Sequence, residues 1–392
     1  MENKKVLGIV AEYNPFHTGH KYHILESKEK TGAEYVVAVM SGNFTQRGEP
    51  SLLNKWKRSE LAIKAGVDLV IELPFVFACN SAEYFAKGSV GVLNGLGIID
   101  YLSFGSESGS LEDLSKTADL LLKESDEFKE KLQLFLKKGD SFPKARAKAL
   151  GHYGKFLNDP NNLLAIEYLK ELKALNSNIK PMTILRKGSD YNSDKLGALF
   201  SSANGIRKSI ENKDKTAAGR FLPEEIREDI LNEERFSFVN DQKYFQCLKF
   251  IFLRDNKFGE IFSCSEGLEN IVSREIRNVG NIEELIDKLK SKRYTRTRIM
   301  RFLAHSLVGL YKGASLDLFG HVLAFNDRGA KILREIKVRE CNDIPIIQKV
   351  NKANVELMGL DIVASDLYNH IYGLDTYLYS DFVKKPFIDK SY

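Results

Sequence analysis

The sequence predicts an α/β protein with a parallel sheet in its first half and a mainly α-helical second half. Over the first hundred residues, short apolar runs alternate with amphipathic stretches. This alternation, with short connections, favours a parallel sheet wound by right-handed crossovers. After Pro223 the strand signal becomes weak and helical spacing dominates, which favours a helical region.

Each element follows from its own pattern. The predicted strands are apolar runs bounded by turn residues, at Val6–Val10, Tyr35–Met40, Asp68–Leu73, Tyr101–Phe104 and Pro181–Leu185. Helical spacing predicts helices at Lys21–Lys30, Lys55–Ala65, Ser81–Asn94, within Leu111–Leu175, and from Ala203 to Ser209. The arrangement is Rossmann-like, so we expect ligands beyond the carboxyl ends of the strands.

The second half is predicted to fold as a separate helical unit. Its helices are expected at Gln242–Phe252, Gly267–Val279, Ile282–Lys290 and Arg296–Leu310. A polar, linker-like run at Glu211–Lys215 precedes them. We therefore predict two domains: residues 1–215, which form a nucleotide-binding catalytic unit, and residues 216–392, which form a mainly helical, basic unit.

Composition narrows the class of protein. The chain is 43% hydrophobic and 28% charged, as in ordinary globular proteins. No apolar run approaches the roughly 20 residues that span a bilayer, and Val6–Val10 is too short for a secretory signal. The four cysteines lie far apart without a CxxC pair, so we expect the protein in the reducing cytoplasm. Since no apolar run is long enough to span a bilayer, we expect no membrane partner.

The most informative segment is Ala11–His20, which directly follows the first strand and opens the first helix. Asn14-Pro15 marks a turn, and Gly19 allows the backbone to approach a ligand closely. The N-terminus of the following helix offers unpaired N–H groups and the positive end of a dipole. The segment therefore predicts an anion site.

Three histidines, His17, His20 and His23, share one helical face if the helix begins at His17. Imidazole N–H groups at a helix N-terminus suit a phosphoryl group under attack. The alternatives are a zinc site and ordinary surface histidines. No thiolate lies nearby, and neither Glu12 nor Glu26 has a familiar ligand spacing, so the phosphate site is favoured.

His17-Thr18-Gly19-His20 resembles the HxGH signature of the nucleotidyltransferase superfamily, which is related to class I aminoacyl-tRNA synthetases. The resemblance implies that His17 and His20 are catalytic and contact the phosphates of ATP. A second superfamily element is similar to Phe200–Arg207, where hydroxyls and a guanidinium suit the β- and γ-phosphates. The same Ser-Ser-Ala-Asn run is also an ordinary helix N-cap.

Further blocks resemble one bacterial family, the tRNA(Met) cytidine acetate ligases. They are Glu12–His17, Met40–Gly48, Phe104–Glu107, Pro160–Leu163 with Ile166–Leu169, and Lys292–Thr295 with Thr297-Arg298. The resemblance implies that acetate and ATP form acetyl-adenylate. The exocyclic amine of the wobble cytidine of elongator tRNA(Met) then attacks it, giving N4-acetylcytidine and AMP. Mg²⁺ is expected with ATP, and DNA is not an expected partner.

The ATP site that this resemblance implies combines the first loop with three later positions and the second superfamily element. Its predicted residues are Val10, Ala11, Glu12, Tyr13, Asn14, Pro15, Phe16, His17, Thr18, Gly19, His20, Lys21, Tyr22, His23, Gly105, Asn161, Arg186, Ser201, Ser202 and Arg207. The choice between Asn161 and Asn162 stays open. We also expect the loop Ser41–Gly48 to contact substrate, whereas Glu83 and Tyr84 either line the site or begin a helix.

A basic segment in the second half predicts the nucleic-acid surface. The net charge is only +5, but Lys288–Lys312 contains eight Lys or Arg residues and no Asp or Glu. Tyr294 is predicted to stack on an exposed base. The predicted tRNA-binding residues are Arg274, Arg277, Lys292, Arg293, Tyr294, Arg296, Arg298 and Arg301. The alternative is a solvated basic helix start.

Two other functions remain open at this point. An adenylyltransferase acting on a small phosphorylated metabolite would explain HxGH, although not the large basic helical half. A non-catalytic RNA-binding protein would explain the basic half, but the intact histidines, Gly19 and Arg207 argue against it.

Overall fold

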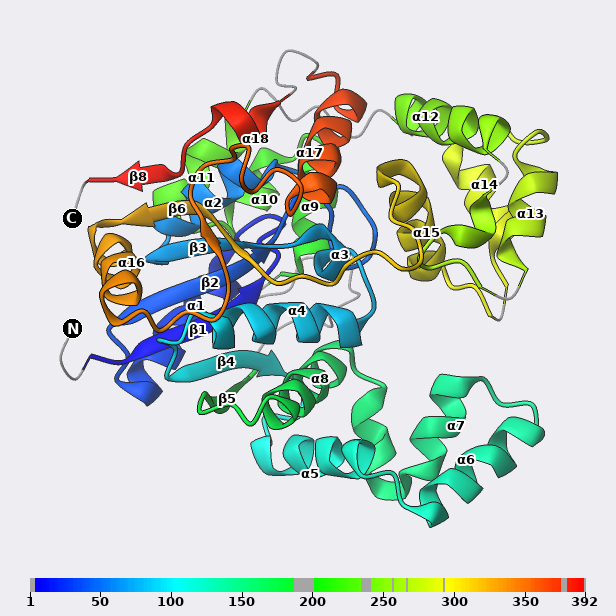
Figure 1. Cartoon of the computed structure of the whole chain (residues 1–392), viewed down its shortest axis with the longest axis horizontal. Helices are drawn as coiled ribbons and strands as arrows, with labels where there is room; N and C mark the ends of the chain where they lie inside the picture. Colours follow the sequence, from blue (N-terminus) through cyan, green and yellow to red (C-terminus); the bar gives the residue numbers. More distant parts are fainter. Residues whose placement is uncertain are drawn as a thin grey trace.

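The computed structural model describes residues 4–186, 201–233, 241–255, 257–265, 267–291, 293–374 and 379–390. Within these residues the centre of the protein is an eight-stranded sheet of order β5-β4-β1-β2-β3-β6-β7, with β8 paired to β6 (Figure 1). The strands are β1 (Val6–Ala11), β2 (Tyr35–Ser41), β3 (Leu69–Leu73), β4 (Tyr101–Ser106), β5 (Lys180–Leu185), β6 (Gly320–Asn326), β7 (Ile346–Ile347) and β8 (Phe387–Asp389).

Strands β1 to β5 run parallel, which confirms the predicted α/β fold. From β1 the chain first moves outward through β2 to β3 and then returns to place β4 on the other side of β1. The strand order therefore reverses between β1 and β4. In sheets of this kind the crevice at such a reversal is where ligands bind.

The sheet carries a hydrophobic core on each face because its strands alternate side chains between the two faces. In β2, Val37 and Val39 belong to one core, and Val36, Ala38 and Met40 belong to the other. The first core is covered by α4 (Ala82–Gly95), α5 (Leu111–Leu122) and α8 (Pro160–Ala174). The second is covered by α1 (Thr18–Thr31), α2 (Lys55–Lys64), α9 (Ala203–Glu211) and α11 (Glu224–Leu231).

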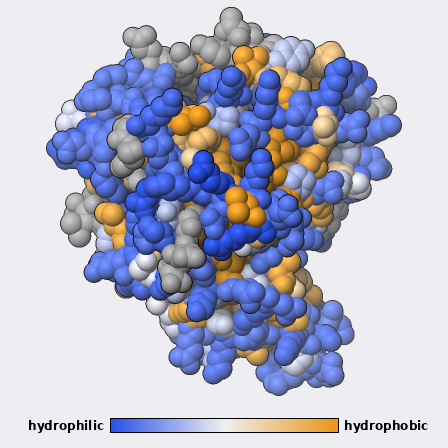
Figure 2. All heavy atoms as spheres, turned by 60° about the vertical axis from the view of Figure 1, so that its left-hand side comes forward, coloured by the Kyte–Doolittle hydropathy of each residue, from blue (hydrophilic) through white to orange (hydrophobic). Residues whose placement is uncertain are grey.

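The described residues form further helices around these layers and beyond them. They are α3 (Phe75–Ala78), α6 (Asp126–Lys137), α7 (Phe142–Ala149), α10 (Lys215–Gly219), α16 (Asp327–Arg339), α17 (Gly359–Ile371) and α18 (Ser380–Val383), with the 3₁₀ turns η1 (Gly151–Leu157) and η2 (Phe258–Glu260). Hydrophilic residues dominate the face shown in Figure 2. No helix within the described ranges is long and apolar enough to cross a membrane.

Four helices of the second half stand together at one end of the molecule, as the sequence predicted (Figure 1). They are α12 (Asp241–Arg254), α13 (Leu268–Glu275), α14 (Ile282–Leu289) and α15 (Arg296–Val308). The rings of Phe252 and Phe302 stack with centroids 5.8 Å apart, and Leu285 is fully buried in the same core. Apolar packing between helices therefore holds this group together.

No strand was predicted after Pro223, but β6 lies there and pairs antiparallel with β3, Leu69 opposite Phe325. Its apolar run, Val322–Phe325, is short and lies outside the strand–helix alternation by which the parallel strands were recognised. Residues from the predicted second domain thus extend the sheet of the first. The boundary between residues 215 and 216 stays a prediction.

A buried ionic cluster fixes this returning segment to the sheet. The ammonium group of Lys55, on α2, lies 2.8 Å from both carboxylate oxygens of Glu72, on β3, and 2.9 Å from Oδ2 of Asp381, on α18. His321 Nδ1, on β6, lies 2.6 Å from Glu72 Oε2. All four side chains are 2% exposed or less. We call Lys55, Glu72, His321 and Asp381 the buried ionic cluster.

Candidate active site

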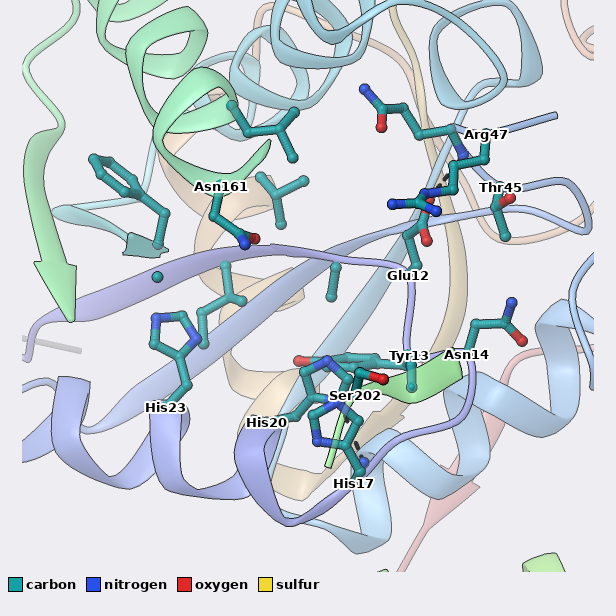
Figure 3. A pocket seen from close by; sticks show the side chains of 18 of the residues that line it. Glu12, Tyr13, Asn14, His17, His20, His23, Thr45, Arg47, Asn161 and Ser202 are labelled. Atoms are coloured by element: carbon teal, nitrogen blue, oxygen red, sulfur yellow. Dashed lines mark hydrogen bonds between the residues drawn. The ribbon is translucent and has the colours of Figure 1, made fainter. Parts of the chain in front are cut away.

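A cavity of about 200 Å³ lies at the carboxyl ends of β1 and β4, at the reversal of strand order (Figure 3). A smaller hollow of about 90 Å³ shares His17, His20, His23, Gly105, Arg186 and Ser202 with it. Most of the predicted ATP-site residues line one or both, namely Val10, Ala11, Glu12, Tyr13, Asn14, His17, Gly19, His20, Tyr22, His23, Gly105, Asn161, Arg186, Ser201, Ser202 and Arg207.

Four predicted residues of the first loop do not line either space. Phe16 is 1% exposed in the hydrophobic core, and Pro15 is buried beside it. The backbone N–H of Thr18 donates to the carbonyl of Phe221, and Lys21 forms an ion pair with Glu225. These four residues therefore help to hold the loop in place without lining the cavity.

The histidine pair is positioned by reciprocal capping of α1. His17 is the N-cap residue, and its Nδ1 accepts from the backbone N–H of Gly19 at 3.1 Å. His20 Nδ1 in turn accepts from the backbone N–H of His17 at 3.2 Å. The two rings stack with centroids 3.7 Å apart. The HxGH sequence thus holds both imidazoles rigidly, since each ring is tied to the backbone of this turn.

Both rings are neutral donors at physiological pH. Because each Nδ1 accepts a hydrogen bond, the ring proton lies on Nε2. Burial lowers the pKa of His17 to about 3, with nearby Arg186 and Arg207 adding to the effect. Burial also lowers the pKa of His20 well below its usual value. The pair can therefore donate two Nε2–H groups to phosphate oxygens without changing protonation.

The zinc alternative finds no support in this geometry. Nδ1 is occupied in His17 and His20, and His23 Nε2 lies 2.8 Å from the hydroxyl of Ser103. Burial lowers the pKa of His23 to about 4. Among the residues that the structure describes, no group of three or more His, Cys, Asp and Glu could hold a metal ion.

The second predicted element lies against the first. Ser202 is the N-cap of α9, and its hydroxyl accepts from the backbone N–H of Gly205 at 3.1 Å. Arg207, one turn further on, donates to the carbonyl of Asn14 at 2.7 Å. Ser202 is therefore both an ordinary N-cap residue and part of the cavity wall, next to His17 in Figure 3.

Two separate sequence blocks meet at the N-terminus of α8. The carboxylate of Glu107 accepts from Nδ2 of Asn161 at 2.6 Å and from the backbone N–H of Asn162 at 2.8 Å. Asn161 lines the cavity, whereas Asn162 is 1% exposed and accepts from the backbone N–H of Ser108. The geometry therefore favours Asn161 as the nucleotide-facing residue.

Part of the wall is apolar, and no sequence pattern assigned it to the site. Phe85, Phe104, Leu164 and Tyr168 line the cavity, and they suit contact with a flat base. Of the two alternatives for Glu83 and Tyr84, the helix start is confirmed, since α4 begins at Ala82. Tyr84 packs against Phe262 instead, with ring centroids 5.4 Å apart, and Glu83 is exposed.

A buried arginine, also missed from sequence, fixes the loops on both sides of the cavity. The Arg58 side chain on α2 is 1% exposed. Its guanidinium donates to the carbonyls of Glu12 and Gly42, to that of Ser41 at 3.1 Å and to that of Leu53 at 2.9 Å. The ends of β1 and β2 are thereby joined. No local pattern in the sequence marks this role.

The predicted tRNA-binding arginines lie on α13, α15 and the turns beside them. Arg293 is exposed, and Arg277 is exposed with one N–H group donating to the carbonyl of Ser273. Arg274 pairs with Glu275 at 2.7 Å, and Arg296 forms two 2.6 Å hydrogen bonds with Glu283. Exposed pairs of this kind are weak, so phosphate can compete for these cations. Lys292 lies outside the described residues.

Three of the predicted tRNA-binding residues, Arg298, Tyr294 and Arg301, are not simply exposed on the surface. Arg298 lies over the ring of Tyr294, with 4.9 Å between the guanidinium carbon and the ring centroid. Tyr294 is only 3% exposed and donates through its hydroxyl to the carbonyl of Ser265 at 2.6 Å. In contrast to the prediction, its ring cannot stack on a base in this conformation. Arg301 is largely buried, and burial lowers its pKa.

Together the parallel sheet and the capped histidine pair define a nucleotidyltransferase of the HxGH type. The model of the HIGH Nucleotidyl Transferase family matches residues 4–379. The chain is 42% identical to a tRNA(Met) cytidine acetate ligase of Thermoanaerobacter sp. (strain X514), covering 96% of this chain and 98% of that one. It is 41% identical to one from Clostridium novyi (strain NT), covering 97% and 98%. The protein belongs to the tRNA(Met) cytidine acetate ligase family.

Solved structures agree with this membership. Thermotoga maritima TmcAL bound with alpha-thio ATP is 32% identical, with a TM-score of 0.88 over 99% of this chain and 100% of that chain. The apo form of the same protein gives a TM-score of 0.90. The fold, the family and the ligase class predicted from sequence are confirmed. Family membership therefore disfavours both alternatives, a metabolite adenylyltransferase and a non-catalytic RNA-binding protein.

Proposed function

We propose that this protein joins acetate to the N4 amine of the wobble cytidine of elongator tRNA(Met), with ATP cleaved to AMP and pyrophosphate. The single observation that carries the proposal is the pair of neutral histidines held by reciprocal capping at the end of β1. Adenylyl transfer requires donors aimed at charge that develops on the α-phosphate, and it needs no nucleophile from the protein.

In the first step, an acetate oxygen attacks the α-phosphorus of ATP and pyrophosphate leaves. His17 and His20 donate their Nε2–H groups to the developing charge. Ser202 and the guanidiniums of Arg186 and Arg207 suit the β- and γ-phosphates. The apolar wall and Asn161 would receive the adenosine. Mg²⁺ would enter with the phosphates of ATP.

In the second step, the cytidine amine attacks the acyl carbon of acetyl-adenylate, and AMP leaves. We propose that the exposed cations Arg274, Arg277, Arg293 and Arg296, together with the half-buried Arg298, bind the anticodon arm. An anticodon loop presents an unstacked base at low energetic cost. The enzyme would act in the cytoplasm, where it meets its tRNA.

The test is to incubate the protein with ATP, radiolabelled acetate and tRNA(Met). We expect label in N4-acetylcytidine and release of AMP in equal amount. A tRNA(Met) that carries uridine at the wobble position is the matched control and should remain unlabelled. Label transfer to that control, or AMP release that does not depend on acetate, would contradict the proposal.

A further inference from the structure

The cavity has two ends of different chemistry. The hollow beside it is lined by the histidines, Arg186 and both serines, and none of the residues Glu12, Thr45, Gln46, Arg47 and Glu49 takes part in it. Figure 3 shows the same division, with His17, His20 and Ser202 together and Glu12, Thr45 and Arg47 away from them. We call the side with Glu12 and Thr45–Glu49 the acceptor end.

The acceptor end lies directly against the basic helix. Gly48 has a φ of +85°, and a Cβ atom at this position would overlap the backbone of Met300 and Arg301 on α15. The turn is closed by hydrogen bonds of 2.9 Å from Thr45 N to Glu49 O and from Gly48 N to Thr45 O. A nucleic acid on α15 is therefore closest to this end of the cavity.

Of the residues that the structure describes, two carboxylates line the cavity, Glu12 and Glu49, and of these two Glu12 is held at both its backbone and its side chain. Its carbonyl accepts from Arg58, and its Oε1 accepts from the backbone N–H of Gln46 at 2.7 Å. Glu49 also lines a separate outer cavity with Asp241, Glu283 and Arg296, so it stands at the rim. Glu12 is the inner, fixed carboxylate.

We propose that the Glu12 carboxylate is the catalytic base that removes the proton from the cytidine amine during acyl transfer. This role rests on the proposed function. The amine nitrogen forms a bond to the acetyl carbon, the bond from that carbon to the AMP oxygen breaks, and one amine proton passes to Glu12 and then to solvent. Loss of the proton keeps the new amide from reverting.

The surroundings of Glu12 suit this task. Burial raises its pKa, although the Gln46 N–H group and the cations Arg207, Arg58 and Arg47, from α9, α2 and the loop, oppose the shift. A carboxylate with a raised pKa is a stronger base for a weakly acidic N–H group. At the phosphate end the neutral imidazoles of His17 and His20 have their Nδ1 atoms occupied by backbone N–H groups, so these rings offer no free acceptor for the amine proton.

The test is Glu12→Gln, which keeps an acceptor for Gln46 N–H but cannot take up a proton. Glu12 also lines the cavity of the proposed ATP site, so acetate-dependent ATP–pyrophosphate exchange is measured beside transfer, and transfer should fall far more than exchange. Single-turnover transfer from preformed acetyl-adenylate should fall by about 10²–10⁴-fold. The wild-type transfer rate should rise with pH to a plateau, whereas the residual rate of the variant should not depend on this ionisation. Glu12→Asp should restore part of the transfer.

Each other outcome is decisive. Loss of exchange together with transfer in Glu12→Gln would place Glu12 in ATP or metal binding and overturn the role as base. Normal exchange and normal transfer would do the same, as would a selective loss of transfer in Glu49→Gln instead. Absence of acetate-dependent exchange in the wild-type protein would overturn the proposed function itself.

Discussion

At the scale of single residues, His17 combines a structural and a chemical task that can be separated. Its Nδ1 caps α1, and its Nε2–H group faces the proposed phosphate position. Asn is among the best N-cap residues but lacks a donor in the place of Nε2. A substitution can therefore keep the N-cap hydrogen bond and remove the Nε2–H donor.

We expect His17→Asn to keep the free energy of unfolding and to lower acetate-dependent ATP–pyrophosphate exchange by about 10²–10³-fold, as for loss of one oxyanion donor. His17→Ala should lose the same activity and also about 0.5–2 kcal/mol of stability through the lost cap. Urea unfolding and exchange assays measure the two effects. Equal exchange in His17→Asn and wild type would remove His17 from the chemistry.

Buried histidines also make stability depend on pH. Burial lowers the pKa of His17 to about 3, and it lowers the pKa values of His23 and His305 to about 4. Below their ordinary value of 6.5 the unfolded chain binds protons that the folded chain does not. Stability should therefore be full above about pH 6.5 and fall as the pH drops toward about 4.

Urea unfolding between about pH 7.5 and pH 4.5 measures this slope. His305→Gln should make the slope shallower, because a buried titrating group is lost while a donor toward the carbonyl of Cys79 is kept. His152 is exposed, so His152→Gln serves as the matched control. An unchanged slope in His305→Gln would mean that this histidine does not contribute.

At the scale of elements, two arginines at or just before the N-terminal end of α15 allow the proposed tRNA interface to be tested. Arg293 is exposed, and Arg298 donates to the carbonyl of Arg293. Replacement of both by Ala should weaken tRNA binding and reduce the slope of log affinity against log salt by about one for each phosphate that is no longer neutralised. Arg339→Ala on α16, also exposed and paired, is the control. An unchanged slope would remove this segment from the proposed interface.

The elements also show what the sequence could and could not predict. Helices with clear spacing and strands followed by glycine or polar turns were placed correctly, and the HxGH segment lies where the strand–turn–helix pattern put it. β6 was missed because its apolar run, Val322–Phe325, is short and lies outside the strand–helix alternation by which the parallel strands were recognised. Arg58 and Phe85 were missed because their roles depend on residues distant in sequence. The burial of Tyr294 depends on its contact with Ser265, which no local pattern shows.

At the scale of the whole molecule, the buried ionic cluster joins the sheet to segments that follow it by more than two hundred residues. Burial opposes the charge of Lys55, but Asp381 and Glu72 outweigh it and raise its pKa. Lys55→Met should lower the free energy of unfolding by about 3–5 kcal/mol, because two buried carboxylates lose their cation. Thermal or urea unfolding measures the loss.

The compensating variant is Lys55→Met combined with Glu72→Gln and Asp381→Asn. It should recover much of the stability, since the carboxylates that lost their cation are then neutral as well. If the single substitution were as stable as wild type, the cluster would contribute nothing to the attachment of the C-terminal segments.

The return of β6 to the edge of β3 has a consequence for synthesis on the ribosome. A nascent chain can form the five parallel strands early, but the outer edge of β3 stays open until residues 320–326 have emerged. During that interval the half-built sheet exposes hydrogen-bonding groups that another chain could pair with. A chaperone that covers this edge would protect the nascent protein from such pairing. The sheet that supports ATP binding is completed only late in translation.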